Sequence, residues 1–296
     1  QVCLKVVKNN KDYLDQSLDE VKLLRYLNLA GDADAARVLR LKEYFYYKEH
    51  LFIVTELLKD NLYDLQEALE AAAAPTYYTL PRVQRIAKQV LQALAFVHAH
   101  GIVHCDLKPE NILVSSFSRC EVKVIDFGSS CFITDSLTSY IQSRSYRAPE
   151  VILGLPYDFK IDVWSLGAIL PELLTGQVLF VNDHVQNMLA RILSLYGPFP
   201  DHMTLKGSEV RKYLTFDGQV FQLTEDGTGV DVLQGAPVAL DDMLGPEAAA
   251  DAGFVDFLNL LLQPDPARRP TAAEALKHPW LAQDLPVEPY DMSLLS

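Results

Sequence analysis

The sequence is poor in cysteine, in long apolar runs and in positive charge, and each shortage excludes a class of protein. The four cysteines form no C-x-x-C pair and no metal-ligand spacing, so a disulfide framework and a zinc module are excluded and a reducing compartment is expected. No apolar run reaches the ~18 residues of a membrane span, and no signal peptide opens the chain, so we expect no membrane association.

The charge balance argues against nucleic acid as a general partner. The formal net charge is −13, from 26 basic and 39 acidic residues. Nucleic-acid phosphates would be repelled by such a chain, although a locally basic groove is compatible with it. With 49% apolar residues over 296 positions, the chain can bury a large core in one domain or two lobes. It begins at Gln1 and enters a strand pattern at once, so we expect a piece of a longer protein.

The most informative stretch is HCDLKPEN at residues 104–111, which places Asp106, Lys108 and Asn111 on one short segment. Pro109 disfavours a helix there, and a short apolar strand follows directly. Three polar groups of different chemistry on a stiff loop predict a functional site. A solvated turn is the alternative, because Asp, Lys, Pro and Asn also favour turns.

Three further motifs follow in order: DFG at 126–128 after an apolar strand, APE at 148–150 and DVWSLG at 162–167. Four such motifs in one order resemble the signature of eukaryotic protein kinases, from Lys5 to about Leu281. The resemblance implies an α+β, bilobal kinase fold with a mainly helical C-lobe. It also implies an ion pair between Glu150 and Arg269 in that lobe.

The N-lobe is expected to be truncated, because the Gly-rich loop that covers ATP phosphates in kinases does not occur before Lys5. The resemblance assigns residues 1–58 to a partial N-lobe containing strand 3, helix C, strands 4 and 5 and the hinge. Residues 59–296 would form the C-lobe, with the catalytic loop, the activation segment and a weakly periodic insert at about 200–250.

Within the small lobe, Lys5 lies on an apolar strand and Glu20 follows fifteen residues later on a helical stripe over 13–29. The resemblance implies that the two form an ion pair, which holds the Lys5 ammonium at the α- and β-phosphates of ATP. A lysine that snorkels at a strand edge is the alternative for Lys5 alone. Two further strands are predicted at 38–41 and 51–55, and apolar residues at helical spacing predict a long helix at 79–100.

The resemblance assigns the chemistry of the catalytic loop residue by residue. Asp106 would orient the attacking hydroxyl and accept its proton, and Lys108 would neutralise the transferring phosphoryl group. Asn111 and Asp126 would bind Mg²⁺ through hard oxygen atoms. Lysine two residues after the aspartate is typical of serine/threonine kinases.

The adenine of ATP would lie at the hinge. Glu56 and Leu58 would bond its edge through backbone groups, and Leu113 would form the floor beneath it. Thr55 would occupy the gatekeeper position. A plain strand end is the alternative, and the weight of this assignment comes from its register with the other motifs.

The catalytic loop departs from most kinases at Cys105, which stands where an arginine usually gathers a phosphate of the activation segment. Tyr140 has Arg144 and Arg147 close behind it, and their guanidinium groups could bind a phosphotyrosine instead. An unmodified tyrosine packed on the loop is the alternative. Together with SSCF at 129–132, this pattern resembles the dual-specificity tyrosine-regulated kinases (the DYRK family). NNK at 9–11 and LGLPY at 153–157 resemble a plant-type or Yak-like branch of that family.

The resemblance implies an ATP- and Mg²⁺-dependent dual-specificity kinase that phosphorylates its own Tyr140 and then Ser or Thr of protein substrates, whose acceptor is often followed by Pro. We expect a monomer in the cytoplasm, the nucleus or both. The rival function is a catalytically weak, kinase-shaped nucleotide-binding scaffold. A small-molecule phosphotransferase fits poorly, because such enzymes lack the APE segment. Retention of the whole polar set from Lys5 to Asp126 favours an active enzyme.

Overall fold

The computed structural model describes residues 1–135, 141–181, 183–224, 229–233 and 235–291. The chain divides into two compact units, Gln1–Asp135 together with Asp284–Ser296, and Ser136–Gln283. In the first unit the elements are β1 (Val2–Val6), α1 (Lys11–Ala30), β2 (Leu41–Tyr47), β3 (His50–Glu56), α2 (Leu62–Ala71), α3 (Leu80–Ala99), β4 (Ile102–Val103), a 3-10 turn (Pro109–Asn111), β5 (Ile112–Ser116), β6 (Glu121–Val124) and β7 (Cys131–Phe132).

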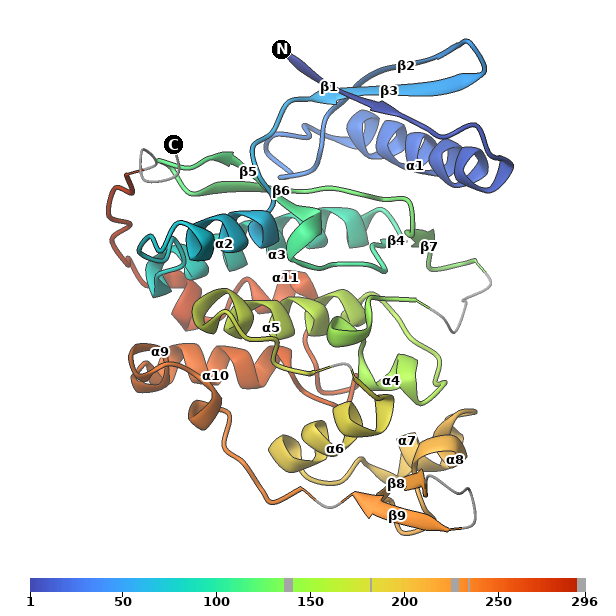
Figure 1. The fold of residues 1–296 in the computed structure, drawn as a ribbon, viewed down its shortest axis with the longest axis vertical. Helices are drawn as coiled ribbons and strands as arrows, with labels where there is room; N and C mark the ends of the chain where they lie inside the picture. The colour runs from blue at the N-terminus through green and yellow to red at the C-terminus, as the bar shows by residue number, and fades with distance from the viewer. Residues whose placement is uncertain (136–140, 182, 225–228, 234, 292–296) are drawn as a thin grey trace. The chain divides into compact units, whose positions relative to one another are not determined.

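The second unit is mainly helical (Figure 1). Its elements are a 3-10 turn (Arg144–Tyr146), α4 (Pro149–Ile152), α5 (Lys160–Thr175), α6 (Val185–Tyr196), α7 (Asp201–Lys206), α8 (Val210–Tyr213), β8 (Val220–Leu223), β9 (Val230–Leu233), a 3-10 turn (Asp241–Met243), α9 (Pro246–Ala250), α10 (Ala252–Leu261), α11 (Ala272–Ala275) and a 3-10 turn (Pro279–Ala282).

The amino-terminal sheet is antiparallel with the strand order β1-β3-β2, and α1 packs along it (Figure 1). Side chains of β3 alternate between buried and half-buried positions, as expected for a strand that faces a core on one side. Val21 of α1 joins Leu51, Ile53 and Val7 in this core. The Asn10 side chain accepts a hydrogen bond from Asp12 N at 2.9 Å and caps the helix.

The predicted strand at 38–41 is wrong in extent, because the strand begins only at Leu41. Val38 forms a parallel bridge with Val124 of β6, and Leu39 N donates to Val124 O at 3.1 Å. The extended segment therefore pairs with β6, outside the amino-terminal sheet. This pairing connects the sheet to the β5–β6 hairpin that follows the 104–111 segment.

Helix α3 carries the β5–β6 hairpin on one side. Its apolar residues recur at helical spacing and are fully buried; they include Val83, Ala87, Val90 and Leu94. The chain leaves the helical conformation after α3 at Gly101, which has φ 77°, a conformation that glycine adopts without strain. The predicted helix at 79–100 is confirmed to within one residue at each end.

In the second unit, α5 and α10 approach closely at Gly167. A Cβ atom at this position would lie 2.9 Å from the Leu262 side chain, so only glycine fits without displacement. Trp164 of α5 stacks on Phe180 with ring centroids 5.4 Å apart. The helix continues through Pro171, which has no N–H to donate to the preceding turn. No helix in the described parts of the chain is long and apolar enough to cross a bilayer.

Candidate active site

Lys5 and Glu20 form the ion pair that the resemblance to protein kinases implies. The Lys5 Nζ atom donates to Glu20 Oε2 at 2.7 Å. The Lys5 side chain comes from β1 and is 51% exposed, whereas the Glu20 side chain from α1 is 7% exposed. The carboxylate therefore acts as a buried anchor, and half of the lysine surface stays accessible to a ligand.

The 104–111 segment brings its three polar residues together, as a functional loop requires. Lys108 Nζ lies 3.1 Å from Asp106 Oδ2, and both side chains are about four-fifths buried, with 23% and 18% exposed. Asn111 Nδ2 donates to the Asp106 carbonyl at 2.8 Å. Pro109 opens a 3-10 turn that ends at Asn111, so the segment is a short turn flanked by extended chain. The structure thus holds the Asp106 backbone rigidly beside Lys108.

His104 joins this loop to the strand that precedes the DFG motif. Its Nε2 lies 2.9 Å from the Ile125 carbonyl, and its Nδ1 lies 3.3 Å from Asp106 N. A carbonyl oxygen can only accept and a backbone N–H can only donate, so the neutral ring must carry its proton on Nε2. The ring also contacts Phe127 with centroids 5.2 Å apart. His104 is therefore a positioning residue that packs on Phe127.

Asp126 lies close enough to Glu20 and to Lys108 to influence the protonation of both side chains. Burial raises the pKa of Glu20 above its ordinary value of 4.5; the Lys5 ammonium opposes this, and the charge of Asp126 adds to it. Burial alone would lower the pKa of Lys108, but the hydrogen bond and charge of Asp106, then the charges of Glu110 and Asp126, raise it above 10.5.

Lys5, Glu20 and Asp126 also line one cavity of about 300 Å³. Asp126 has φ 61°, and its Oδ1 accepts from Gly128 N at 3.2 Å. This turn directs the aspartate toward the cavity that the ion pair borders. Asp126 thus borders the cavity of the ion pair, and the chain next to it is joined to the 104–111 segment by the hydrogen bond from Ile125 N to Asn111 O at 3.0 Å.

Of the residues predicted to form the hinge, Glu56 is the last residue of β3 and Leu58 lies just beyond the strand. Glu56 Oε1 accepts from Arg40 N at 2.7 Å and from Lys123 Nζ at 2.6 Å, so this side chain has a structural role. Lys59 N donates to Val114 O at 2.8 Å, which ties the segment to β5. In the described part of the chain, no backbone group accepts the N–H of Leu58, which lies between these two anchors.

Leu113 lies on β5, half-buried, and forms an antiparallel bridge with Asn61. The structure therefore places it next to the segment that follows Leu58. Thr55 is buried on β3, and its hydroxyl donates to the Glu56 carbonyl at 3.1 Å. These positions agree with an adenine site, and the contacts to adenine stay a prediction.

The predicted phosphate-binding arginines lie in the second unit and differ from each other. Arg147 donates from Nε to Ile141 O and from Nη2 to Gln142 O, each at 2.8 Å. Arg144 is exposed, and among the described residues its guanidinium group has no partner. Tyr140 lies outside the described residues. The Arg147 side chain therefore holds the backbone of its own loop, a role that the sequence pattern did not indicate.

Two further contacts were not expected from the motifs. Cys105 Sγ, buried and with φ 65° at its backbone, lies 3.6 Å from Cys131 Sγ. Gln16 of α1 donates from Nε2 to the Gly128 carbonyl at 3.3 Å, which links α1 to the DFG turn. The cysteines are twenty-six residues apart and Gln16 precedes Gly128 by 112, so no local sequence pattern predicts either contact.

The chain was compared with known proteins. A model of the protein kinase domain matches residues 1–281, which confirms the predicted kinase fold class. Dual specificity tyrosine-phosphorylation-regulated kinase 3 of Macaca fascicularis is 36% identical over 297 residues, which cover 96% of this chain and 52% of that protein. The corresponding kinase mbk-2 of Caenorhabditis elegans is 38% identical, over 98% of this chain and 36% of the relative.

A third relative is the probable serine/threonine-protein kinase dyrk2 of Dictyostelium discoideum, 38% identical over 95% of this chain and 30% of its own length. The chain thus spans about half the length of the first of these curated relatives and less of the others. These three relatives do not test the expected plant-type or Yak-like branch, which stays a prediction.

Proposed function

The chain belongs to the protein kinase domain family, and from this premise we propose that it transfers the γ-phosphoryl group of ATP to Ser or Thr hydroxyls of protein substrates. The observation that carries the proposal is that two groups of polar residues lie beside Asp126: it lines the cavity of the first group, and its neighbour Ile125 donates to the Asn111 carbonyl of the second at 3.0 Å. One group is the Lys5–Glu20 ion pair, and the other is the Asp106–Lys108 pair with Asn111. A protein that only binds partners has no chemical need for this whole set.

In the proposed reaction, Asp106 accepts a hydrogen bond from the substrate hydroxyl and orients its oxygen for in-line attack. The new O–P bond forms as the bond from the γ-phosphorus to its bridging oxygen breaks, and the hydroxyl proton passes to Asp106. The Lys108 ammonium, held 3.1 Å from the Asp106 carboxylate, places positive charge beside the transferring group. The raised pKa of Lys108 keeps it protonated at neutral pH.

The residues present fit a Mg²⁺ ion that is bound together with nucleotide phosphates. Asn111 donates through Nδ2 to a backbone carbonyl, which leaves its Oδ1 as a ligand, and Asp126 supplies a carboxylate. Mg²⁺ commonly takes only one or two protein oxygens and completes its shell with phosphates and water. When bound, it would offset the negative charge of the phosphates.

We propose that the protein also phosphorylates its own Tyr140, and that Arg144 is the main residue that binds the resulting phosphotyrosine. The similarity to kinases whose names state dual specificity and tyrosine phosphorylation supports this. Arg147 would add to the site only through the donors that its backbone contacts leave over. A proline after the substrate Ser or Thr, a monomeric state and a cytoplasmic or nuclear location belong to the same proposal.

We assign residues 1–58 to a partial N-lobe and residues 59–296 to the C-lobe. The connection through Val38, Lys59 and the β5–β6 hairpin supports a boundary near this point, because it joins the amino-terminal sheet to the helical part of the first unit. The adenine would bind along this connection, at the backbone of Glu56 and Leu58 and over Leu113.

The test uses the full-length protein beside an Asp106→Asn variant. Peptide mass spectrometry is expected to find phosphate on Tyr140 in the wild type and none in the variant. Transfer from Mg-ATP to a Ser/Thr peptide library should fall by about 10²–10⁴-fold in the variant. Equal transfer by both proteins would overturn the assignment of Asp106. No phosphate and no transfer in either protein would instead favour the nucleotide-binding scaffold.

A further inference from the structure

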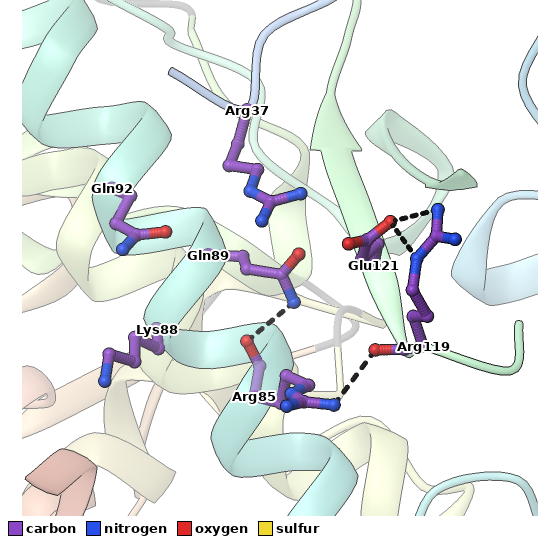
Figure 2. A pocket seen from close by; sticks show the side chains of 7 residues that line it. All are labelled: Arg37, Arg85, Lys88, Gln89, Gln92, Arg119 and Glu121. Carbon is purple, nitrogen blue, oxygen red and sulfur yellow. Dashed lines mark hydrogen bonds and ion pairs between the residues drawn. The ribbon is translucent and has the colours of Figure 1, made fainter. Parts of the chain in front are cut away.

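A second cavity in the first unit, of about 430 Å³, shares no lining residue with the candidate active site (Figure 2). Three segments that are distant in the sequence form it. They are Arg37, a stripe on α3, and the residues Arg119 and Glu121 around the turn into β6. Every lining residue is polar, and four of the chain's 26 basic residues are among them.

The α3 stripe consists of Arg85, Lys88, Gln89 and Gln92, at spacing i, i+3, i+4 and i+7. These positions lie on one face of an α-helix, opposite the apolar face that is buried. Gln89 is buried and donates from Nε2 to Cys120 O at 2.8 Å, while its Oε1 accepts from Val122 N at 3.1 Å. The stripe is therefore fixed to the β5–β6 hairpin by hydrogen bonds and does not depend on a ligand for its position.

Arg37 is fixed on the other side of the cavity. Its backbone has φ 58°, its N donates to Asp34 O at 3.2 Å, and its O accepts from Val124 N at 2.9 Å. Figure 2 shows the Arg37 side chain extending between the α3 stripe and Glu121. The guanidinium group thus reaches into the cavity from a pinned backbone, so only side-chain motion is needed to bind a ligand there.

The charges of the cavity are unbalanced. Its one carboxylate, Glu121, is paired with Arg119 at 2.9 Å. Arg85 donates from Nη1 to the Arg119 carbonyl at 3.1 Å, a neutral partner. Among the residues that the structure describes, Arg37 and Lys88 form no ion pair. Three cations without a carboxylate partner therefore border one cavity, in a chain whose net charge is −13.

We propose that this cavity binds a ligand that carries two or more phosphate groups. Guanidinium groups match phosphate oxygens through paired, charge-assisted hydrogen bonds, and a lysine ammonium adds a point charge. The volume falls within the ~300–1,000 Å³ of sites that hold a whole small ligand. One inorganic phosphate would leave much of it unfilled. The ligand is a soluble polyphosphate or a peptide segment with neighbouring phosphorylated residues, and phosphate is the chemistry common to both.

The test measures binding of inorganic tripolyphosphate to the full-length protein by calorimetry at low salt. All proteins carry Lys5→Gln, which removes the lysine expected to bind phosphate at the active site, so the remaining binding lies elsewhere. Arg37→Gln with Arg85→Gln removes two cavity cations. Lys11→Gln with Arg25→Gln removes two exposed cations of α1 and is the control with matched charge. Lys88→Gln, at an exposed helical position, gives an independent reading should the double variant fail to fold.

We expect the cavity double variant to raise the Kd about ten-fold or more and Lys88→Gln to raise it by less, because charge-assisted bonds are lost. The α1 control should stay within about two-fold, since exposed charges at a distance are screened. Equal weakening in control and cavity variants would overturn the proposal, as would no change in the cavity variants or no binding by any protein.

A second arm separates the two sources of phosphate. An eight-residue peptide with two adjacent phosphoserines competes with tripolyphosphate if the cavity receives a phosphorylated segment, and its unmodified form does not. Tripolyphosphate binding that the phosphopeptide leaves unchanged assigns the cavity to a soluble polyphosphate. Both outcomes support a polyphosphate-binding cavity, provided that the binding is lost in the double variant Arg37→Gln with Arg85→Gln. Competition by the unmodified peptide would contradict it, because phosphate would not be what is recognised.

Discussion

Arg269 and Glu150 form a bidentate ion pair with no exposed side-chain surface on either partner. Arg269 Nη1 lies 2.6 Å from Glu150 Oε1, and Nη2 lies 3.0 Å from Oε2. The guanidinium group also donates to the Gln263 and Lys160 carbonyls at 2.9 and 3.1 Å and lies over the Trp164 ring. The resemblance to protein kinases implied this ion pair, and the structure contains it.

Removing one member of this pair should destabilise the protein strongly. Arg269→Met leaves the Glu150 carboxylate buried without a counter-charge, and we expect a loss of about 3–5 kcal/mol in the free energy of unfolding. The measurement is urea unfolding followed by fluorescence. The double variant Arg269→Met with Glu150→Leu removes both charges and should lose less than the single variant. A double variant that is less stable than the single one would contradict this account.

The protonation of Lys108 should depend on Asp106. Asp106→Asn removes a hydrogen-bonded carboxylate 3.1 Å from the ammonium, so the pKa of Lys108 should fall toward or below 10.5. NMR titration of ¹³Cε-labelled lysine measures this shift. A Glu110→Gln variant, which removes a more weakly acting charge, should lower the pKa less. Equal shifts in the two variants would show that net charge, and not the contact, sets the pKa.

Glu20 should make stability fall with rising pH over a defined window. Its folded-state pKa is raised by burial, so the native protein holds more protons than the unfolded chain from about pH 4.5 up to that raised pKa. Across this window the free energy of unfolding therefore decreases as pH rises. Glu20→Gln removes the contribution, and the stability difference, wild type minus variant, should shrink as pH rises. Urea unfolding at stepped pH values measures it.

The control for Glu20 is Glu43→Gln, which removes an exposed carboxylate on β2. The same change of slope in this variant would assign the effect to net charge. A wild-type-minus-variant difference for Glu20 that grows with pH would contradict a raised pKa. The Lys5 partner opposes the shift, so Lys5→Gln should widen the pH window.

Periodic patterns predicted the long elements of this fold, because burial of one face repeats along the chain. The helices at Lys11–Ala30 and Leu80–Ala99 follow from such stripes. The segment at 38–41 was misassigned because an extended apolar stretch does not reveal its pairing partner, which in this chain is Val124. The region at 200–250 contains elements of three to six residues, too short for a clear period.

The contacts of the candidate site also include some that the sequence predicted and some that it could not predict. The resemblance to protein kinases was sufficient to predict the Lys5–Glu20 and Glu150–Arg269 pairs, which the structure contains. The backbone contacts of Arg147 were not predictable, because they depend on the course of the loop that the chain takes after Ile141. The basic cavity could not be predicted either, since Arg37, Arg85 and Arg119 meet only in the folded chain.

The two predicted phosphate-binding arginines should respond differently to substitution. Arg144→Gln removes an exposed side chain, so it should leave the unphosphorylated protein unchanged and destabilise the Tyr140-phosphorylated form by about 1.5–3 kcal/mol, the value of a hydrogen bond to a charged group. Arg147→Gln should destabilise both forms, because it removes the bonds to Ile141 O and Gln142 O in either state. Thermal unfolding of both forms of each variant measures this.

Equal losses of stability in both forms of Arg144→Gln would exclude Arg144 as the residue that binds the phosphate. A loss confined to the phosphorylated form of Arg147→Gln would mean that the backbone contacts of Arg147 contribute little to stability.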